Sequence, residues 1–201
     1  MLLKEGAHLI ETEAKVLLTL QQFTQLKQYF NVEDESFLYQ ENTYYDTVNS
    51  TLKDLRSAFR LRNFKTTSEW TLKQSLNQYD ALEINQSNNQ PIQPAPSTIE
   101  PQWIHLEALQ SFFKDHHIDL STLHKTYQIE TYRYWIATPY GDIALDKSQY
   151  ANITDYEMEL EMTNLKEGLI FFNQLLEQFN IPNEPAPKKI ARVAQATKRS
   201  I

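Results

Sequence analysis

The stretch Glu11-Thr12-Glu13-Ala14-Lys15 decides the fold of this chain, because it places a charge on every second residue. It lies in a run over residues 8–18 whose composition is typical of a β-strand. Side chains alternate between the two faces of a strand, so Glu11, Glu13 and Lys15 share one face. Successive carboxylates on that face stand roughly 7 Å apart, at about 3.4 Å per residue. Such carboxylates repel each other, which predicts a cation beside them, and a divalent metal ion is a natural candidate.

The alternative interpretation is a half-buried strand whose charged face lies in water. Other segments argue against it, because residues 156–162 place three glutamates on one strand face in the same alternating way. Cations recur at similar positions elsewhere, at Arg60, Arg62, Lys73, Arg133, Lys189 and Arg192. An eight-stranded barrel lined by carboxylates on one side and by Arg and Lys on the other predicts a site for a divalent metal ion and a polyanion.

The composition limits the possible functions. A length of 201 residues fits one large domain or two small ones, and the net charge of −7 argues against general nucleic-acid binding. Cysteine is absent, which excludes disulfides and thiolate chemistry. Three glycines cannot build a glycine-rich phosphate loop, so side chains must bind any phosphate. The N-terminus lacks the order of a signal peptide and no apolar run is long enough to span a membrane, which predicts a cytoplasmic protein.

Hydrophobic periodicity predicts about eight mainly antiparallel strands with helices among and after them. Strands are expected over residues 8–18, 37–46, 56–64, 69–76, 81–85, 122–138, 142–148 and 156–162. Helices are expected over residues 20–30, 103–116, 164–179 and 188–198, and residues 86–101 are expected to form a long polar loop. Trp103, Phe112 and Phe113 are expected to pack in the core. This pattern predicts an α+β fold with a closed barrel.

In their order along the chain, these motifs resemble the CYTH superfamily, also called triphosphate tunnel metalloenzymes. The resemblance rests on Glu-x-Glu-x-Lys at residues 11–15, on the paired Arg60 and Arg62, and on the later charged positions. It implies a single domain over residues 1–201, an eight-stranded antiparallel tunnel, a bound triphosphate, and Mg²⁺ or Mn²⁺ as the metal ion.

The resemblance also implies roles for individual residues. The metal ion would be held by Glu11, Glu13, Glu159 and Glu161, and which two of Glu157, Glu159 and Glu161 contribute is left open. The phosphates would be bound by Lys15, Arg60, Arg62, Lys73, Arg133 and Lys189, with Arg192 as a weaker candidate. Asp146 matches an acidic family position that helps place a second metal ion or water, and it joins Glu11, Glu13, Lys15, Glu159 and Glu161 as a catalytic candidate. The arginine that usually precedes the position of Glu83 is missing.

The expected function is metal-dependent hydrolysis of a triphosphate, with inorganic triphosphate as the favoured substrate because no base-recognition motif is visible. The alternatives are a class IV-type adenylate cyclase, a thiamine triphosphatase, or a sensor that binds triphosphates or nucleotides without turnover. A β-rich domain without a ligand is a further alternative. The expected partner is a small polyphosphate, without nucleic acid or membrane, and the protein is expected to be a monomer or homodimer.

Overall fold

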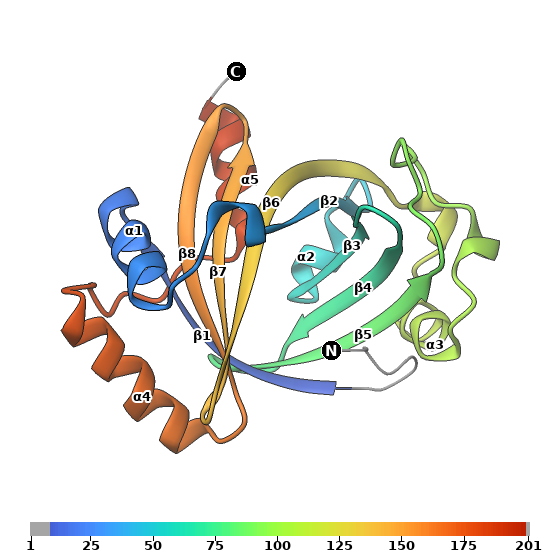
Figure 1. Cartoon of the computed structure of the whole chain (residues 1–201). Helices are drawn as coiled ribbons and strands as arrows, with labels where there is room; N and C mark the ends of the chain where they lie inside the picture. The colour runs from blue at the N-terminus through green and yellow to red at the C-terminus, as the bar shows by residue number, and fades with distance from the viewer. Residues whose placement is uncertain (1–8, 200–201) are drawn as a thin grey trace. The chain divides into compact units, whose positions relative to one another are not determined.

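The computed structural model describes residues 9–199. Its eight strands are hydrogen-bonded in the order β1-β5-β4-β3-β2-β6-β7-β8, and this order closes on itself. The strand pairs whose register is defined are antiparallel. The topology therefore confirms the predicted eight-stranded antiparallel barrel with helices (Figure 1).

The strands agree with the predicted ones in number and order. Their bounds are β1 Leu9–Leu18, β2 Leu38–Asp46, β3 Ser57–Asn63, β4 Ser68–Ser75, β5 Asp80–Asn88, β6 His124–Thr138, β7 Gly141–Tyr150 and β8 Ile153–Met162. The predicted first strand begins at residue 8, which lies outside the described residues. Strand β5 is longer than predicted and the polar loop correspondingly shorter, because Asn88 pairs with Ser68 of β4. Pairing with a neighbour thus extends a strand through residues with low β-propensity.

The helices are α1 Leu20–Tyr29, α2 Thr51–Asp54, α3 Glu107–Asp115, α4 Leu165–Gln178 and α5 Lys189–Arg199. Helix α3 begins later than the predicted residue 103, because Pro101–Trp103 forms a separate 3-10 turn. None of the helices within residues 9–199 is long and apolar enough to cross a bilayer.

The described residues group into two compact units. Unit 1 contains residues 9–10 and 40–128, and unit 2 contains residues 11–39 and 129–199. A single domain over the whole chain stays a prediction.

Unit 1 is built on the antiparallel meander of β3, β4 and β5, with β2 paired to β3. One face of this sheet is apolar because Phe59, Trp70 and Ile84 alternate with polar residues along their strands. These side chains form a buried core with Leu109 and Phe113 of α3. Phe112 and Phe113 are buried and Trp103 packs against the same core, which confirms their predicted role. The opposite face of the sheet is left for polar side chains.

Unit 2 contains the sheet of β1, β8, β7 and β6, in that order. Helices α1 and α4 contact β8 (Figure 1). The segment before α5 is fixed to β1, since the amide of Ala186 donates to the carbonyl of Lys15 at 3.0 Å and Pro185 forms a bridge with Val16. This attachment determines where α5 begins.

Gly141 at the start of β7 is a position where a larger residue is not tolerated. Its φ of +137° is rare for other residues, and a Cβ there would lie 1.9 Å from the carbonyl oxygen of Glu161. We expect Gly141→Ala to lower the free energy of unfolding by at least about 1–3 kcal/mol, the cost of one strained backbone position. Urea unfolding tests this. A free energy of unfolding equal to that of wild type would show that the backbone at Gly141 tolerates a side chain.

Candidate active site

Strand register in unit 2 brings the predicted carboxylates onto one sheet face. Glu159 of β8 lies opposite Lys15 of β1, and Glu161 lies opposite Glu13. On its other side, β8 pairs with β7 so that Glu157 lies opposite Asp146. Because side chains alternate along each strand, all of these residues point to the same face. The cluster therefore follows directly from the period of two in the sequence.

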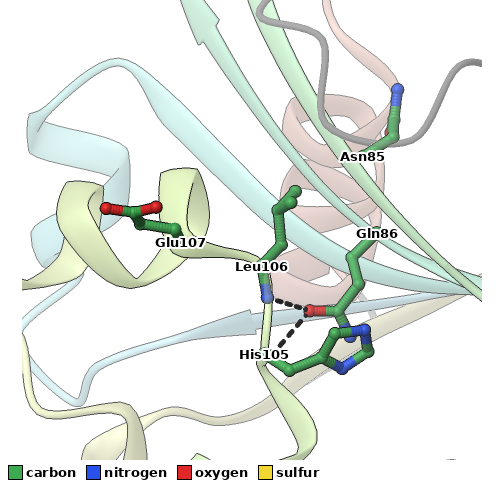
Figure 2. A pocket seen from close by; sticks show the side chains of 5 residues that line it. All are labelled: Asn85, Gln86, His105, Leu106 and Glu107. Atoms are coloured by element: carbon green, nitrogen blue, oxygen red, sulfur yellow. Dashed lines mark hydrogen bonds between the residues drawn. The ribbon is translucent and has the colours of Figure 1, made fainter.

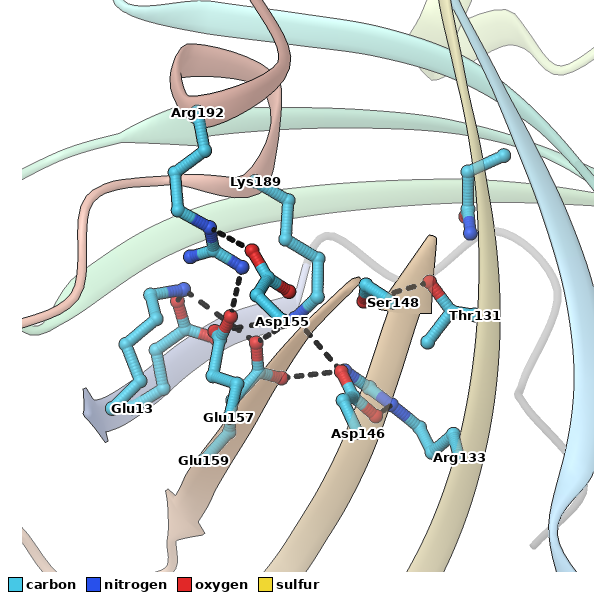
Figure 3. Close-up of polar contacts among 12 residues, drawn as sticks. Glu13, Thr131, Arg133, Asp146, Ser148, Asp155, Glu157, Glu159, Lys189 and Arg192 are labelled. Carbon is cyan, nitrogen blue, oxygen red and sulfur yellow. Dashed lines mark hydrogen bonds and ion pairs between the residues drawn. The ribbon is translucent and has the colours of Figure 1, made fainter. Parts of the chain in front are cut away.

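Arg133 of β6 ties two of these carboxylates together. Its Nε donates to Asp146 Oδ1 at 2.7 Å, and its Nη2 donates to Asp146 Oδ2 and to Glu159 Oε2, each at 2.6 Å (Figure 3). Asp146 has no exposed surface. A forked guanidinium is suited to this bidentate geometry. Arg133 thus helps to keep this buried carboxylate charged.

Two cations of α5 extend this network. Lys189 Nζ lies 2.7 Å from Asp146 Oδ2, 2.7 Å from Glu159 Oε1 and 3.2 Å from Glu157 Oε1. One turn later, Arg192 donates from Nε to Asp155 at 2.9 Å and from Nη2 to Glu157 (Figure 3). Arg192 is buried, so its role here is as well supported as that of Lys189.

The two buried glutamates of this network differ in protonation. Burial by itself would raise the pKa of Glu159, but Lys189 and Arg133 outweigh it and hold that pKa well below its usual range. Burial raises the pKa of Glu157 to about 7, although Lys189 and Arg192 oppose the shift. Glu159 is therefore ionised at neutral pH and paired with cations, whereas Glu157 exchanges a proton near neutral pH.

Glu11 and Glu161 form a different kind of pair at the acidic end of the cluster. Burial raises the pKa of Glu161 to about 9, and a hydrogen bond with Glu11 and the charge of Glu11 raise it further in the same direction. Two carboxylates held close together do not both ionise readily, so one of them keeps its proton to a higher pH. This donor set fits a hard divalent cation, which prefers carboxylate oxygens.

As placed, the described residues contain no group of three or more carboxylate or imidazole side chains arranged around a metal position. The cations explain this, because Lys15 pairs with Glu13 and Arg133 and Lys189 pair with Glu159. Metal binding would therefore require Glu13 to exchange its lysine partner for the ion.

The Glu11–Glu161 pair predicts a pH dependence of stability in metal-free protein. A carboxyl group whose folded pKa lies above its unfolded value of about 4.3 binds its proton more tightly in the folded state. Its contribution to stability is complete below pH 4.3 and is lost as the pH rises through about 9. We expect the unfolding free energy of wild type to fall more steeply between pH 6 and about 9 than that of Glu161→Gln, measured by urea unfolding with chelator. Parallel curves for the two proteins would contradict the shared proton.

The predicted cations Arg60, Arg62 and Lys73 lie in unit 1, on the polar face of its sheet. Arg62 is already paired, since its Nε donates to Asn42 and its Nη1 to Glu69, each at 3.0 Å. Lys73 lies opposite Glu83, with its Nζ 3.9 Å from the carboxylate. Two rows of this face thus supply their own acidic partners.

The row of residues between these two on the same sheet face contains no acidic residue. Arg60, Thr71 and Asn85 lie side by side across β3, β4 and β5. Arg60 Nε, Thr71 Oγ1 and Asn85 Oδ1 are each buried without a hydrogen-bond partner among the described residues. Buried polar groups without partners each cost about 1–3 kcal/mol, and a ligand oxygen could complete the bonds of Arg60 and Thr71. Of the three unit 1 cations, Arg60 is the best placed to accept an anion.

A small pocket of about 140 Å³ lies elsewhere in unit 1, between β5 and the start of α3 (Figure 2). The side-chain amide of Gln86 accepts from the backbone of His105 and Leu106 and donates to Trp103. The pocket is smaller than a typical ligand site, and its polar groups hold the loop to the sheet. We assign it a structural role.

Each predicted site residue is therefore placed in one of two groups. Unit 2 brings together Glu11, Glu13, Lys15, Arg133, Asp146, Glu159, Glu161, Lys189 and Arg192, and unit 1 brings together Arg60, Arg62 and Lys73. Two residues of these networks were not predicted from the sequence, Asp155 and Glu69. Each continues an alternating run of charged residues: Asp155 precedes the β8 glutamates, and Glu69 precedes Lys73.

Comparison with known proteins identifies the family of this chain. A family model described as CYTH domain matches residues 9–194. The Bacillus subtilis (strain 168) protein named "Putative triphosphatase YjbK" is 31% identical over 194 residues, which are 96% of this chain and 98% of that protein.

Solved structures share the fold. A Bacillus halodurans protein described as a "putative adenylate cyclase" is 28% identical with a TM-score of 0.77, covering 90% of this chain and 96% of that one. HpAC1 from Hippeastrum, described as having a dominant triphosphatase activity, is 18% identical with a TM-score of 0.69, covering 92% and 95%. At that identity HpAC1 supports the fold alone. With its motifs, its strand order and a family model that matches nearly its full length, this chain belongs to the CYTH domain family.

Proposed function

We propose that this chain is a triphosphatase that hydrolyses inorganic triphosphate in a divalent-metal-dependent reaction. The observation that carries the proposal is the strand register that sets Glu13 opposite Glu161 on one sheet face, beside a network of buried cations. Family membership and the similarity to a relative named as a triphosphatase support the same activity.

Glu11, Glu13 and Glu161 are the proposed ligands of Mg²⁺ or Mn²⁺. Glu159 is a poorer candidate for a ligand, because two cations already hold it at hydrogen-bond distance. A bound divalent ion would supply charge neutralisation and orientation of the phosphate chain. Releasing Glu13 to the ion would also release Lys15, which would then be available to a phosphate oxygen.

Lys15, Arg133 and Lys189 are the proposed phosphate ligands of unit 2, and Arg60, Arg62 and Lys73 those of unit 1. Arg133 still has guanidinium N–H groups to offer after its bonds to Asp146 and Glu159. Fixed cations in a site shielded from water stabilise the charge that develops on the leaving phosphate. Asp146 and Arg192 hold these cations and glutamates in position.

The proton of the attacking water needs an acceptor. We propose Glu157 as the acceptor of this proton, because its pKa of about 7 lets it exchange a proton at neutral pH.

Product analysis tests the proposal. Inorganic triphosphate, ATP and thiamine triphosphate are incubated in parallel with Mg²⁺, with Mn²⁺ and with chelator. The proposal expects metal-dependent release of phosphate, fastest from inorganic triphosphate. Pyrophosphate and cyclic nucleotide from ATP would establish the cyclase instead. Saturable binding without any product would establish a sensor.

A further inference from the structure

Trp135 is an exposed aromatic residue beside the most heavily charged part of unit 2. It lies two residues after Arg133 on β6, so both side chains lie on the same sheet face. The Arg133 guanidinium carbon is 4.8 Å from the centre of the Trp135 ring, within the range of a cation–π contact. Even so, 39% of Trp135 remains exposed, whereas Trp70 is fully buried.

Two neighbours of Trp135 on this face have small side chains. Opposite it on β7 is Ala144, and two residues further along β6 is Ala137. Both side chains end at a methyl group. The next residue in the same row, beyond Ala144, is Glu159 of the charged cluster. The ring therefore lies beside Arg133, a proposed phosphate ligand, while part of its surface is exposed.

We propose that Trp135 is a specificity-determining residue that stacks an aromatic heterocycle attached to a phosphate chain, and so distinguishes organic triphosphates from inorganic triphosphate. The inference rests on the proposed function, since it takes Arg133 as a phosphate ligand. Arg133 would bind a phosphate oxygen while the adjacent ring supports the base. Inorganic triphosphate has no group that uses this surface.

Steady-state kinetics test the stack. Trp135→Leu is expected to raise the ratio of KM for ATP to KM for inorganic triphosphate by about 5- to 150-fold, the equivalent of one base–aromatic stack. Trp135→Phe keeps a π-face and is expected to retain most of the preference. Thiamine triphosphate in a parallel series shows whether a purine or the thiamine rings are the better occupant.

Tyr140→Leu is the matched control. Tyr140 is 38% exposed, nearly the same as Trp135, but its ring is already stacked on Phe171 with centroids 4.7 Å apart. We expect the KM ratio of this variant to equal that of wild type. If Trp135→Leu raised KM equally for ATP and for inorganic triphosphate, the ring would act only by holding Arg133. That result would overturn the proposal.

Tryptophan emission gives a readout that does not require turnover. In chelator, ATP is expected to quench the emission of wild type saturably, and Trp135→Phe is expected to lose that quenching. Hydrolysis of inorganic triphosphate without any quenching by ATP would overturn the stack and leave the proposed function intact. Quenching without hydrolysis of any triphosphate would support the stack and refute the proposed function.

Discussion

Glu11→Gln is expected to lower metal-dependent phosphate release from inorganic triphosphate by at least ~100-fold. The substitution keeps the shape of the side chain but removes one charged oxygen donor of the proposed ion. A metal ion contributes several kcal/mol to stabilising transition-state charge, and each 1.36 kcal/mol is a factor of ten in rate. Phosphate release at saturating Mg²⁺ is the measurement, and Glu177→Gln on the exposed side of α4 is the control.

The same variant has a second expected property. Because Glu11 contributes to the raised pKa of Glu161, its neutralisation lowers that pKa and reduces the cost of keeping Glu161 protonated at pH 8. We expect Glu11→Gln to be more stable than wild type to urea at pH 8 in chelator. A variant that is inactive because it is misfolded would be less stable, so the two measurements together separate the causes. Wild-type turnover by Glu11→Gln would refute its assignment as a metal ligand.

Arg133→Met is expected to lower the free energy of unfolding by about 3 kcal/mol. Removing one partner of a buried ion pair leaves an uncompensated charge and costs about 3–5 kcal/mol. The lower end of this range applies to Arg133→Met, because Lys189 still neutralises Asp146 and Glu159 in the variant. Burial alone would raise the pKa of Asp146, but Arg133 and Lys189 outweigh it and lower that pKa. Urea unfolding at pH 7 measures the loss.

Arg133→Lys is the matched control, since it keeps the positive charge without the fork that bonds both oxygens of Asp146. We expect the free energy of unfolding of Arg133→Lys to lie between those of wild type and Arg133→Met. A change below about 1 kcal/mol for Arg133→Met would show that the pair contributes as little as a surface salt bridge.

Much of unit 2 could be predicted because a period of two assigns each charged residue to a face. Glu11, Glu13 and Lys15 were placed together on this basis, and so were the glutamates of β8. The order in which the strands pair around the barrel could not be worked out from this period.

The partners of the charged residues could not be predicted. Which cation meets which carboxylate depends on strand register and on where α5 begins, and the bridge from Pro185 to Val16 fixes that start. The same limit applies to Glu69, whose pairing with Arg62 follows from the register of β3 and β4. Trp135 gave no signal in the sequence either, because one aromatic residue at the end of a strand usually packs in a core.

The most direct test of metal-dependent triphosphate hydrolysis uses a single sample. Purified protein in chelator is mixed with inorganic triphosphate, and phosphate is followed before and after Mg²⁺ is added in excess. The account predicts no release before the addition, and afterwards one phosphate and one diphosphate for each triphosphate consumed. Release at the same rate in chelator, or none after Mg²⁺ with folded protein, would contradict it.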